Sequence, residues 1–296
     1  MPFRDDVGAA YQDPAMGEVF IGTEAVAGGV VTRHELARWY RRLFPNVHVE
    51  KGPLTLSDRI TGAWLWSKRR GIVTGVAASA LHGAEWVDAE VAIEMLYNCA
   101  HPPKGIRTRN ERVSDDEFTM IGDLPVATAG RTAFDLGRYL ERGPAIARMD
   151  ALMRAEAFSA EEVLLLAKRY QGARGVKRVR DVLPLVDGGA ASPRETWLRL
   201  LFIDAGLPRP TTQIPIFDEY GQLLRTVDMG WEEFKVVAEY DGDQHRTNRV
   251  QYVKDQRIIP EIERLGWIVQ RAIKEDHPQY LVRRAWDALV SRGWRP

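Results

Sequence analysis

The chain has 296 residues, of which 45% are apolar and 28% are charged. This composition predicts a folded protein with buried cores and excludes wholesale disorder and fibrous architectures. Its 41 basic residues equal its 41 acidic residues, which argues against a protein that simply coats polyanions. A chain of this length predicts two compact domains.

Cysteine usage and hydropathy predict where the protein works. Cys99 is the only cysteine, so no disulfide forms within the chain, and a reducing cytoplasm is the expected compartment. No apolar stretch approaches the roughly 18 residues of a membrane-spanning helix, and the first residues lack the apolar core of a signal peptide. We therefore expect a cytoplasmic protein without membrane association.

A stretch of small and turn-forming residues at 186–193 separates two periodic regions of the sequence. Such stretches are typical of connections between domains. We therefore predict a first region over 1–185 and a second region over 186–296.

The first region begins with two predicted helices. A capping box that starts at Thr32 predicts a helix through Leu43, and Ser57 is expected to cap a helix over 59–70. With the strand-like segment 47–49 between them, these helices are compatible with a winged-helix module. Basic residues at the ends of both helices are candidates for phosphate contacts with nucleic acid, namely Arg38, Arg41, Arg42, Lys68, Arg69 and Arg70.

The middle of the chain mixes both periodicities. Strands are predicted over 72–74, 91–95 and 105–109, and helices over 131–140, 144–156 and 159–170. The first region is therefore expected to continue as a mixed α/β structure.

The second region has a clear order of elements. A helix is predicted first, then three strands, a helix, a strand and a last helix, which gives the order α-β-β-β-α-β-α. The apolar spacing in the first of these helices predicts that Trp197 is a core residue. The first helix is predicted over 192–205, and the three strands over 212–217, 223–229 and 234–240. The second helix is predicted over 249–265, the last strand over 267–271 and the last helix over 278–292.

Three acidic residues converge in this order of elements. Asp228 ends the second strand, while Glu239 and Asp241 end the third and share one face of it. Carboxylates at adjoining strand ends suit a hard divalent cation such as Mg²⁺ or Mn²⁺. The alternative is that His245 and a neighbouring arginine pair with the acids and that no chemistry takes place.

Neighbouring residues complete this candidate site. His245 or Gln244 is placed to orient or deprotonate a water molecule, and Lys254 or Arg257 to steady phosphate oxygens. Glu195 follows Ser192 in a capping box, Ser192-Pro-Arg-Glu195, in which Glu195 accepts the amide of Ser192, so a structural role at the start of the first helix is one expectation for this residue.

Several segments of the second region resemble the restriction-endonuclease-like (PD-(D/E)XK) superfamily. Over residues 190–285 the chain is most similar to a domain related to the very short patch mismatch-repair endonuclease. The matching segments are Ser192-Pro-Arg-Glu-Thr-Trp-Leu-Arg199, Gly206-Leu-Pro-Arg-Pro210, Val227-Asp-Met229, Val237-Ala-Glu-Tyr-Asp-Gly-Asp-Gln-His245, Asp255-Gln-Arg257 and Gly266-Trp-Ile-Val269.

This resemblance implies magnesium-dependent hydrolysis of phosphodiesters, with Asp228 and Glu239 as metal ligands and Glu195 as a supporting acid. Asp241 stands where the superfamily usually has a lysine, so the sequence departs from the Glu-x-Lys pattern. Asp241 is then a candidate second metal ligand, and His245 or Gln244 is the candidate for activating the water.

The first region resembles abortive-infection antitoxin-like regulators over about residues 30–155, and actinobacterial proteins that join both regions are similar to the whole chain. That resemblance implies an N-terminal winged helix that binds DNA and a remainder that contacts partner proteins. It is carried by Thr32-Arg-His-Glu-Leu36, Asp58-Arg-Ile60, Thr74-Gly-Val-Ala-Ala-Ser-Ala-Leu-His-Gly83, Leu124-Pro-Val126 and Arg131-Thr-Ala-Phe-Asp-Leu136.

Two functions follow from these expectations. The first is a metal-dependent DNA endonuclease with an N-terminal DNA-binding module. The alternative is a DNA-binding regulator without catalysis, whose altered nuclease fold serves for homodimer formation or for binding a toxin–antitoxin-type protein partner. The missing lysine favours the regulator, and the retained acids favour the enzyme.

Overall fold

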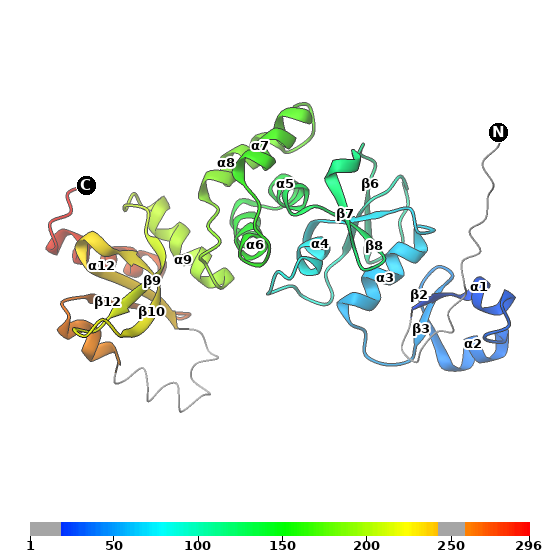
Figure 1. The fold of residues 1–296 in the computed structure, drawn as a ribbon, viewed down its shortest axis with the longest axis horizontal. Coiled ribbons are helices and arrows are strands. Elements are labelled where there is room, and N and C mark those ends of the chain that lie inside the picture. The colour runs from blue at the N-terminus through cyan, green and yellow to red at the C-terminus, as the bar shows by residue number, and fades with distance from the viewer. Residues whose placement is uncertain (1–18, 242–257) are drawn as a thin grey trace. The chain divides into compact units, whose positions relative to one another are not determined.

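The computed structural model describes residues 19–241 and 258–296, which form two compact units of mixed α/β structure (Figure 1). The first unit contains the described residues up to Leu81 together with Val87–Thr128, and the second contains His82–Trp86 and the described residues from Ala129 onward. The α/β class expected from the sequence is confirmed. In these described parts, every helix is too short or too polar to cross a lipid bilayer.

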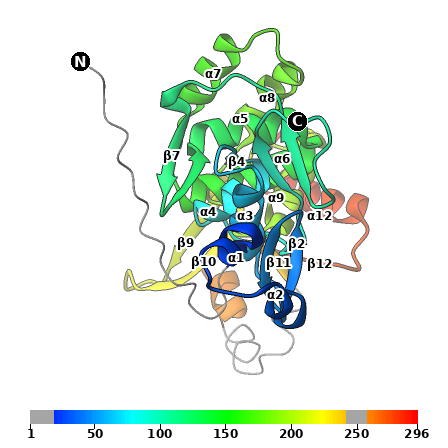
Figure 2. The ribbon, with the colours of Figure 1, turned by 90° about the vertical axis from the view of Figure 1, so that its right-hand side faces the viewer.

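The first unit opens with β1 (Phe20–Ile21), α1 (Gly22–Ala27), α2 (Arg33–Trp39), β2 (Tyr40–Phe44) and β3 (Val47–Glu50). Figure 2 shows α1, α2 and β2 in blue. The three strands form an antiparallel sheet in the order β1-β3-β2. The capping box at Thr32 is confirmed, since its side chain accepts the Glu35 amide and Glu35 accepts the Thr32 amide.

Two predictions for the first helices are wrong. The helix that begins after Thr32 ends at Trp39 instead of Leu43, because Tyr40–Phe44 pairs with β3. The next helix, α3 (Leu56–Trp66), is capped by Thr55 and not by Ser57, because Thr55 and Asp58 form the capping box. Arg41 and Arg42 therefore lie on a strand, and the basic run 68–70 follows α3.

A five-stranded mixed sheet completes the first unit. Its order is β6-β5-β4-β8-β7, and α4 (Gly75–Leu81) packs beside it. The three strands predicted in this part are confirmed within a few residues, and the hairpin of β7 and β8 is an addition. The strands are β4 (Ile72–Thr74), β5 (Ile93–Leu96), β6 (Ile106–Arg109), β7 (Phe118–Ile121) and β8 (Leu124–Ala127), and η1 (Asp115–Glu117) precedes β7.

Helices form the first part of the second unit. They are α5 (Ala129–Tyr139), α6 (Arg142–Ala155), α7 (Ala160–Arg169) and α8 (Val176–Val182), followed by η2 (Leu183–Leu185). The first three match the predicted helices. The expected boundary near residue 186 lies inside this unit, immediately after η2.

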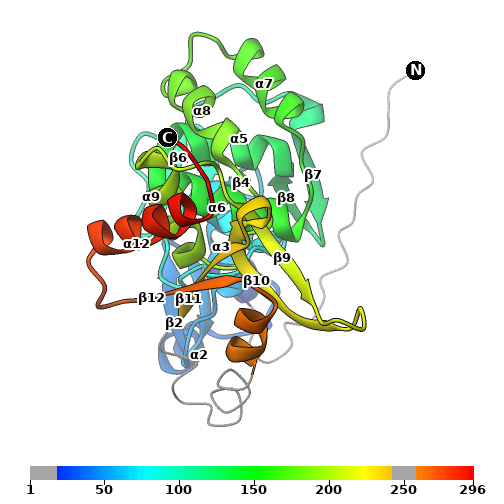
Figure 3. The same ribbon diagram turned by 90° about the vertical axis from the view of Figure 1, so that its left-hand side faces the viewer.

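The second unit ends in a four-stranded sheet with the order β12-β11-β10-β9, in which β11 and β12 are parallel and the other pairs are antiparallel (Figure 3). The predicted order α-β-β-β-α-β-α is observed in the described residues. Its elements are α9 (Pro193–Asp204), β9 (Thr211–Phe217), β10 (Leu223–Trp231), η3 (Glu232–Phe234), β11 (Val236–Asp241), a helix over 258–264, β12 (Ile268–Ile273) and α12 (Pro278–Ser291).

Alternation along β11 builds a separate core on each face of this sheet. Ala238 packs with Leu198 of α9 and with residues of α12, whereas Val237 packs with Ile262 of the helix over 258–264. Trp197 is 36% exposed and its ring lies against that of Tyr240, so its prediction as a core residue is wrong. A helix of this length presents only part of its circumference to the sheet.

Candidate functional site

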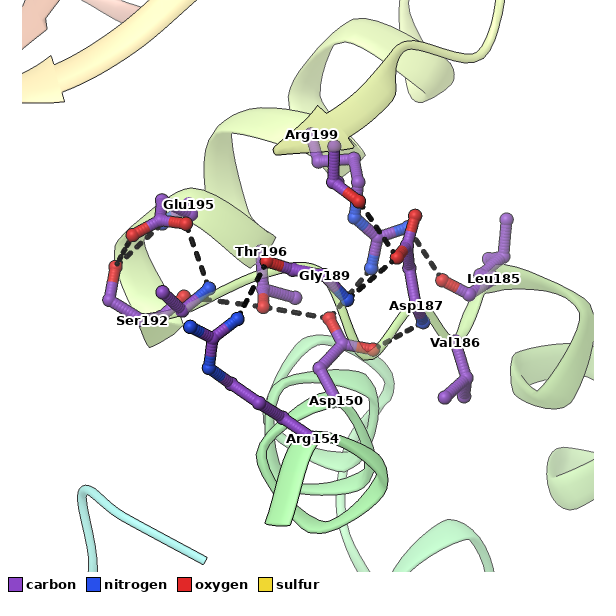
Figure 4. A network of polar contacts seen from close by, with 12 residues as sticks. Asp150, Arg154, Leu185, Val186, Asp187, Gly189, Ser192, Glu195, Thr196 and Arg199 are labelled. Carbon is purple, nitrogen blue, oxygen red and sulfur yellow. Dashed lines mark hydrogen bonds and ion pairs between the residues drawn. The ribbon is translucent and has the colours of Figure 1, made fainter. Parts of the chain in front are cut away.

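A buried polar network joins α6 to the start of α9 and to the segment between them (Figure 4). Asp150 of α6 accepts hydrogen bonds from Arg199 Nη2 at 2.7 Å and from Thr196 Oγ1 at 2.8 Å, both on α9. Its other oxygen accepts the Asp187 amide at 2.7 Å. Arg199 also donates to the Leu185 carbonyl, so the segment between the two helices is held at several points.

The charges of this network are deeply buried. Asp150 is 1% exposed and Arg199 is fully buried. Burial raises the pKa of Asp150 to about 6, while the charge of Arg199 and the three hydrogen bonds oppose this rise. Each charge thus depends on the other, because a buried charge without its partner is costly. The network fixes the first turns of α9, where Glu195 lies.

Glu195 is held at the N-terminus of α9. Ser192 caps the helix and accepts the Glu195 amide at 3.2 Å, and Pro193 is the first helical residue. The Glu195 carboxylate accepts the Ala191 amide at 2.8 Å and the Ser192 hydroxyl at 3.0 Å. The predicted capping role of Glu195 is therefore confirmed. The backbone amide that its carboxylate accepts is that of Ala191, however, and not that of Ser192.

Asp228 acts electrostatically on this carboxyl group. Glu195 is 7% exposed, and burial together with the negative charge of Asp228 raises its pKa to about 7. The hydrogen bonds from Ala191 and Ser192 and the charge of Arg154 oppose the rise. The fold therefore brings together two carboxyl groups from α9 and β10 whose negative charges disfavour each other.

Asp228 also marks where β10 and β11 stop pairing regularly. The last pair in their register is Met229 with Ala238, and beyond it the Tyr240 amide donates to the Asp228 carboxylate at 2.7 Å. Tyr240 also contacts α9, because the guanidinium group of Arg194 lies 5.8 Å from the centre of its ring. Asp228 therefore lies beside Tyr240 near the end of β11, but inside β10, which continues to Trp231, and not at the end of its strand as the sequence predicted.

The other two acids of the predicted site are paired with arginines. Glu239 is 6% exposed and accepts Arg225 Nε of β10 at 2.6 Å. The Asp241 carboxylate accepts a hydrogen bond from Arg271 Nη2 of β12. Alternation along β11 directs both acids to the face of the helix over 258–264, opposite the face that α9 covers. The structure therefore separates Glu239 and Asp241 from Glu195.

The donor set at this end of the sheet consists of carboxylate oxygens, which suits Mg²⁺ or Mn²⁺. Glu195 and Asp228 fit such an ion, because a divalent cation relieves the repulsion that raises the pKa of Glu195. In the described part of the chain, no three His, Cys, Asp or Glu side chains are grouped to hold a metal. Two carboxylates with water ligands are a usual magnesium site.

The sequence reasoning missed Arg225 and Arg271. Arg225 was visible as a cation three residues before Asp228 on the same predicted strand. Arg271 becomes a neighbour only because β12 pairs with β11 in parallel, with Glu239 opposite Arg271. The remaining residues predicted for this site, Gln244, His245, Lys254 and Arg257, lie outside the described residues.

The basic residues predicted in the first unit differ in what they can contact. Arg38 and Arg42 are exposed on α2 and β2, and Lys68 and Arg70 are exposed after α3. Arg69 forms two hydrogen bonds with Glu24 of α1, at 2.9 and 2.7 Å. Arg41 is half-buried, and its Nε and Nη2 atoms have no hydrogen-bond partner among the described residues.

Comparison with known proteins identifies relatives in one bacterial species. No family model matches the chain. The uncharacterized proteins MT2308 and Rv2248, from two strains of Mycobacterium tuberculosis, are each 31% identical to it over 222 residues. Each match covers 73% of this chain and 77% of the relative.

Proposed function

This chain belongs to the same family as the two Mycobacterium tuberculosis proteins, and we propose that it is a Mg²⁺- or Mn²⁺-dependent DNA endonuclease with an N-terminal DNA-binding module. The geometry that carries the proposal is the placement of Glu195, 7% exposed and held by Ala191 and Ser192 at the start of α9, together with Asp228 of β10, whose carboxylate accepts the Tyr240 amide. Burial and the charge of Asp228 both raise the pKa of Glu195, and clustered acids with shifted pKa values are markers of functional sites.

Glu195 and Asp228 would hold the divalent cation. When bound, the ion lowers the pKa of a water molecule and polarises the phosphodiester. Ala191 and Ser192 keep the Glu195 carboxylate oriented, and the Tyr240 amide does the same for Asp228. His245 remains the residue proposed to accept the proton of the attacking water.

The lysine that this kind of site usually has is replaced by Asp241, which pairs with Arg271, while Glu239 pairs with Arg225. Both ion pairs belong to the face of β11 opposite Glu195, so these arginines neutralise Glu239 and Asp241 and are not assigned to the phosphate at Glu195 and Asp228. Lys254 and Arg257 are proposed to contact the flanking phosphates.

Assignment of residues 190–285 to the restriction-endonuclease-like superfamily is part of the same proposal. The order of α9, three strands, a helix and the parallel strand β12 supports it. In the first unit, β1, α1, α2 and the hairpin of β2 and β3 support a winged-helix module. Helix α2 has no buried residue and carries Arg38 and Trp39 on its surface, as a helix that enters a DNA groove requires.

The deciding experiment is cleavage of supercoiled plasmid, single strands and mismatched duplexes in Mg²⁺, Mn²⁺ or chelator. Wild-type protein should cut at least one substrate only with metal, and Asp228→Asn and Glu195→Gln should each reduce the rate at least 100-fold. Asp287→Asn, an exposed acid of α12, is the matched control and should cut normally. Cutting that survives both site substitutions would refute the assignment.

The second candidate is a regulator that binds DNA without cutting it. The ion pairs of Glu239 with Arg225 and of Asp241 with Arg271 favour it, because arginines already neutralise these acids. Such a protein would use the second unit to form a homodimer or to bind a toxin–antitoxin-type partner. Folded protein that cuts no substrate, shows no metal-dependent rise in melting temperature and still binds duplex DNA would favour this function over the enzyme.

A further inference from the structure

A cleft lies beside the turn that holds Glu195. Its volume is about 190 Å³, and it is built within the second unit from the segment before β5, from α6 and from the turn before α9. The walls combine an indole ring, a guanidinium group and a carboxylate with small residues. The lining residues are Gly83, Glu85, Trp86, Ala151, Arg154, Ala155 and Ala191.

Trp86 is presented to this cleft by specific contacts. Its backbone is in the left-handed region, with φ of 63°, and its carbonyl oxygen accepts a hydrogen bond from Arg148 Nη1. The indole Nε1 donates to the Ala191 carbonyl at 2.9 Å, so one edge of the ring is anchored while the side chain remains about half exposed, at 47%. A positive φ is uncommon for a bulky residue, and backbone strain of this kind clusters at functional sites.

The same turn connects the cleft to the candidate metal site. Ala191 accepts Trp86 with its carbonyl and donates its amide to Glu195 at 2.8 Å. Arg154 extends from α6 toward this turn, as Figure 4 shows, and donates to the Gly189 carbonyl at 3.3 Å. Ala191 therefore contacts both Trp86 in the cleft and the Glu195 carboxylate that is proposed to hold the cation.

We propose that this cleft binds one unpaired nucleotide of a single-stranded DNA segment, with its base stacked on Trp86 and its phosphate on Arg154. Glu85 would accept a hydrogen bond from a base N–H. A base inside a duplex has both faces covered by its neighbours and cannot stack on a side chain unless it leaves the helix. The inference rests on the proposed endonuclease and specifies its substrates as single-stranded or distorted DNA.

The test is binding of a fluorescein-labelled single-stranded oligonucleotide, and of its duplex, in chelator so that no cleavage occurs. Trp86→Ala should weaken binding of the single strand about 5- to 150-fold, the range for loss of one base–aromatic contact, and should change duplex binding less than twofold. Trp86→Phe keeps an aromatic face but has a smaller ring and loses the bond to Ala191, so it should weaken binding of the single strand less than Trp86→Ala does. Tyr220→Ala, which removes a side chain that is 86% exposed, is the aromatic control and should have no effect.

The outcomes test the nucleotide site in the cleft independently of the proposed endonuclease activity. Unchanged binding by Trp86→Ala, or equal losses for single strand and duplex, would overturn the nucleotide site even if the wild-type protein cuts DNA. Loss confined to the single strand would support the site even if the protein cuts nothing. Wild-type protein that binds neither DNA would overturn the site as well as the DNA-binding function.

Discussion

Replacing Glu195 by glutamine should make the stability of this protein less dependent on pH. Burial and the charge of Asp228 raise the pKa of Glu195 from 4.5 to about 7 in the folded state. Its contribution to stability is therefore complete below pH 4.5 and is lost as pH rises through 7, because the unfolded chain releases the proton first. At about 1.4 kcal/mol per pKa unit, the loss amounts to about 3 kcal/mol above pH 8.

Glutamine does not titrate, but it can still accept the Ala191 amide and contact Ser192. The free energy of unfolding of Glu195→Gln relative to wild type should thus rise by about 2.5 kcal/mol between pH 5 and pH 8.5. This difference is measured by urea unfolding, monitored through tryptophan fluorescence. The titration of Asp150 cancels in the difference, because wild type and variant both contain this residue. Mg²⁺ should reduce the gain, since the cation neutralises the ionised Glu195 of the wild type.

Glu162→Gln is the matched control, because this exposed glutamate accepts the Ser159 amide in the capping box of α7. The pH-dependent change for Glu195→Gln should exceed any change that Glu162→Gln shows over the same range. A constant difference for Glu195→Gln would refute the inference that the Glu195 carboxyl group is buried within reach of the charge of Asp228.

Other substitutions test the parts of the fold that support the site. Asp150→Asn should lower the free energy of unfolding by about 3–5 kcal/mol, because Arg199 then stays buried without a counter-charge, whereas Asp287→Asn at an exposed pair should cost less than about 1 kcal/mol. Urea unfolding is again the measurement, and equal effects would contradict the role of the network. Gly230→Ala should cost about 1–3 kcal/mol in the same assay, because a Cβ there would lie 2.4 Å from the Val236 carbonyl oxygen, while Gly143→Ala meets nothing and should not destabilise. Arg42→Ala should lower the salt dependence of duplex binding by about one phosphate contact. Arg69→Ala should lower it less, because Glu24 already holds that guanidinium, and a larger effect at Arg69 would contradict this.

Capping chemistry and short-range periodicity made much of the fold predictable. The box at Thr32 begins a helix as expected, and Ser192 with Pro193 begins α9, because these contacts involve neighbours three residues apart. The end of the helix after Thr32 was predicted wrongly, since Tyr40–Phe44 can satisfy its backbone with β3 instead of with the preceding turn. That competition depends on a partner strand that local propensity does not describe.

For the candidate site, the sequence by itself determined that Asp228 and Glu239 lie on neighbouring strands, that Asp241 ends β11 and that Glu195 belongs to the first turn of α9. Only the tertiary structure decided the charges around them: the negative charge of Asp228 disfavours ionisation of Glu195, Glu239 is paired with Arg225, and Asp241 is paired with Arg271. The physical reason is that side-chain alternation assigns residues to faces of one strand, whereas charge pairing depends on which other strands and helices pack beside it. The parallel pairing of β12 with β11 and the buried link between Asp150 and Arg199 are long-range contacts of that kind.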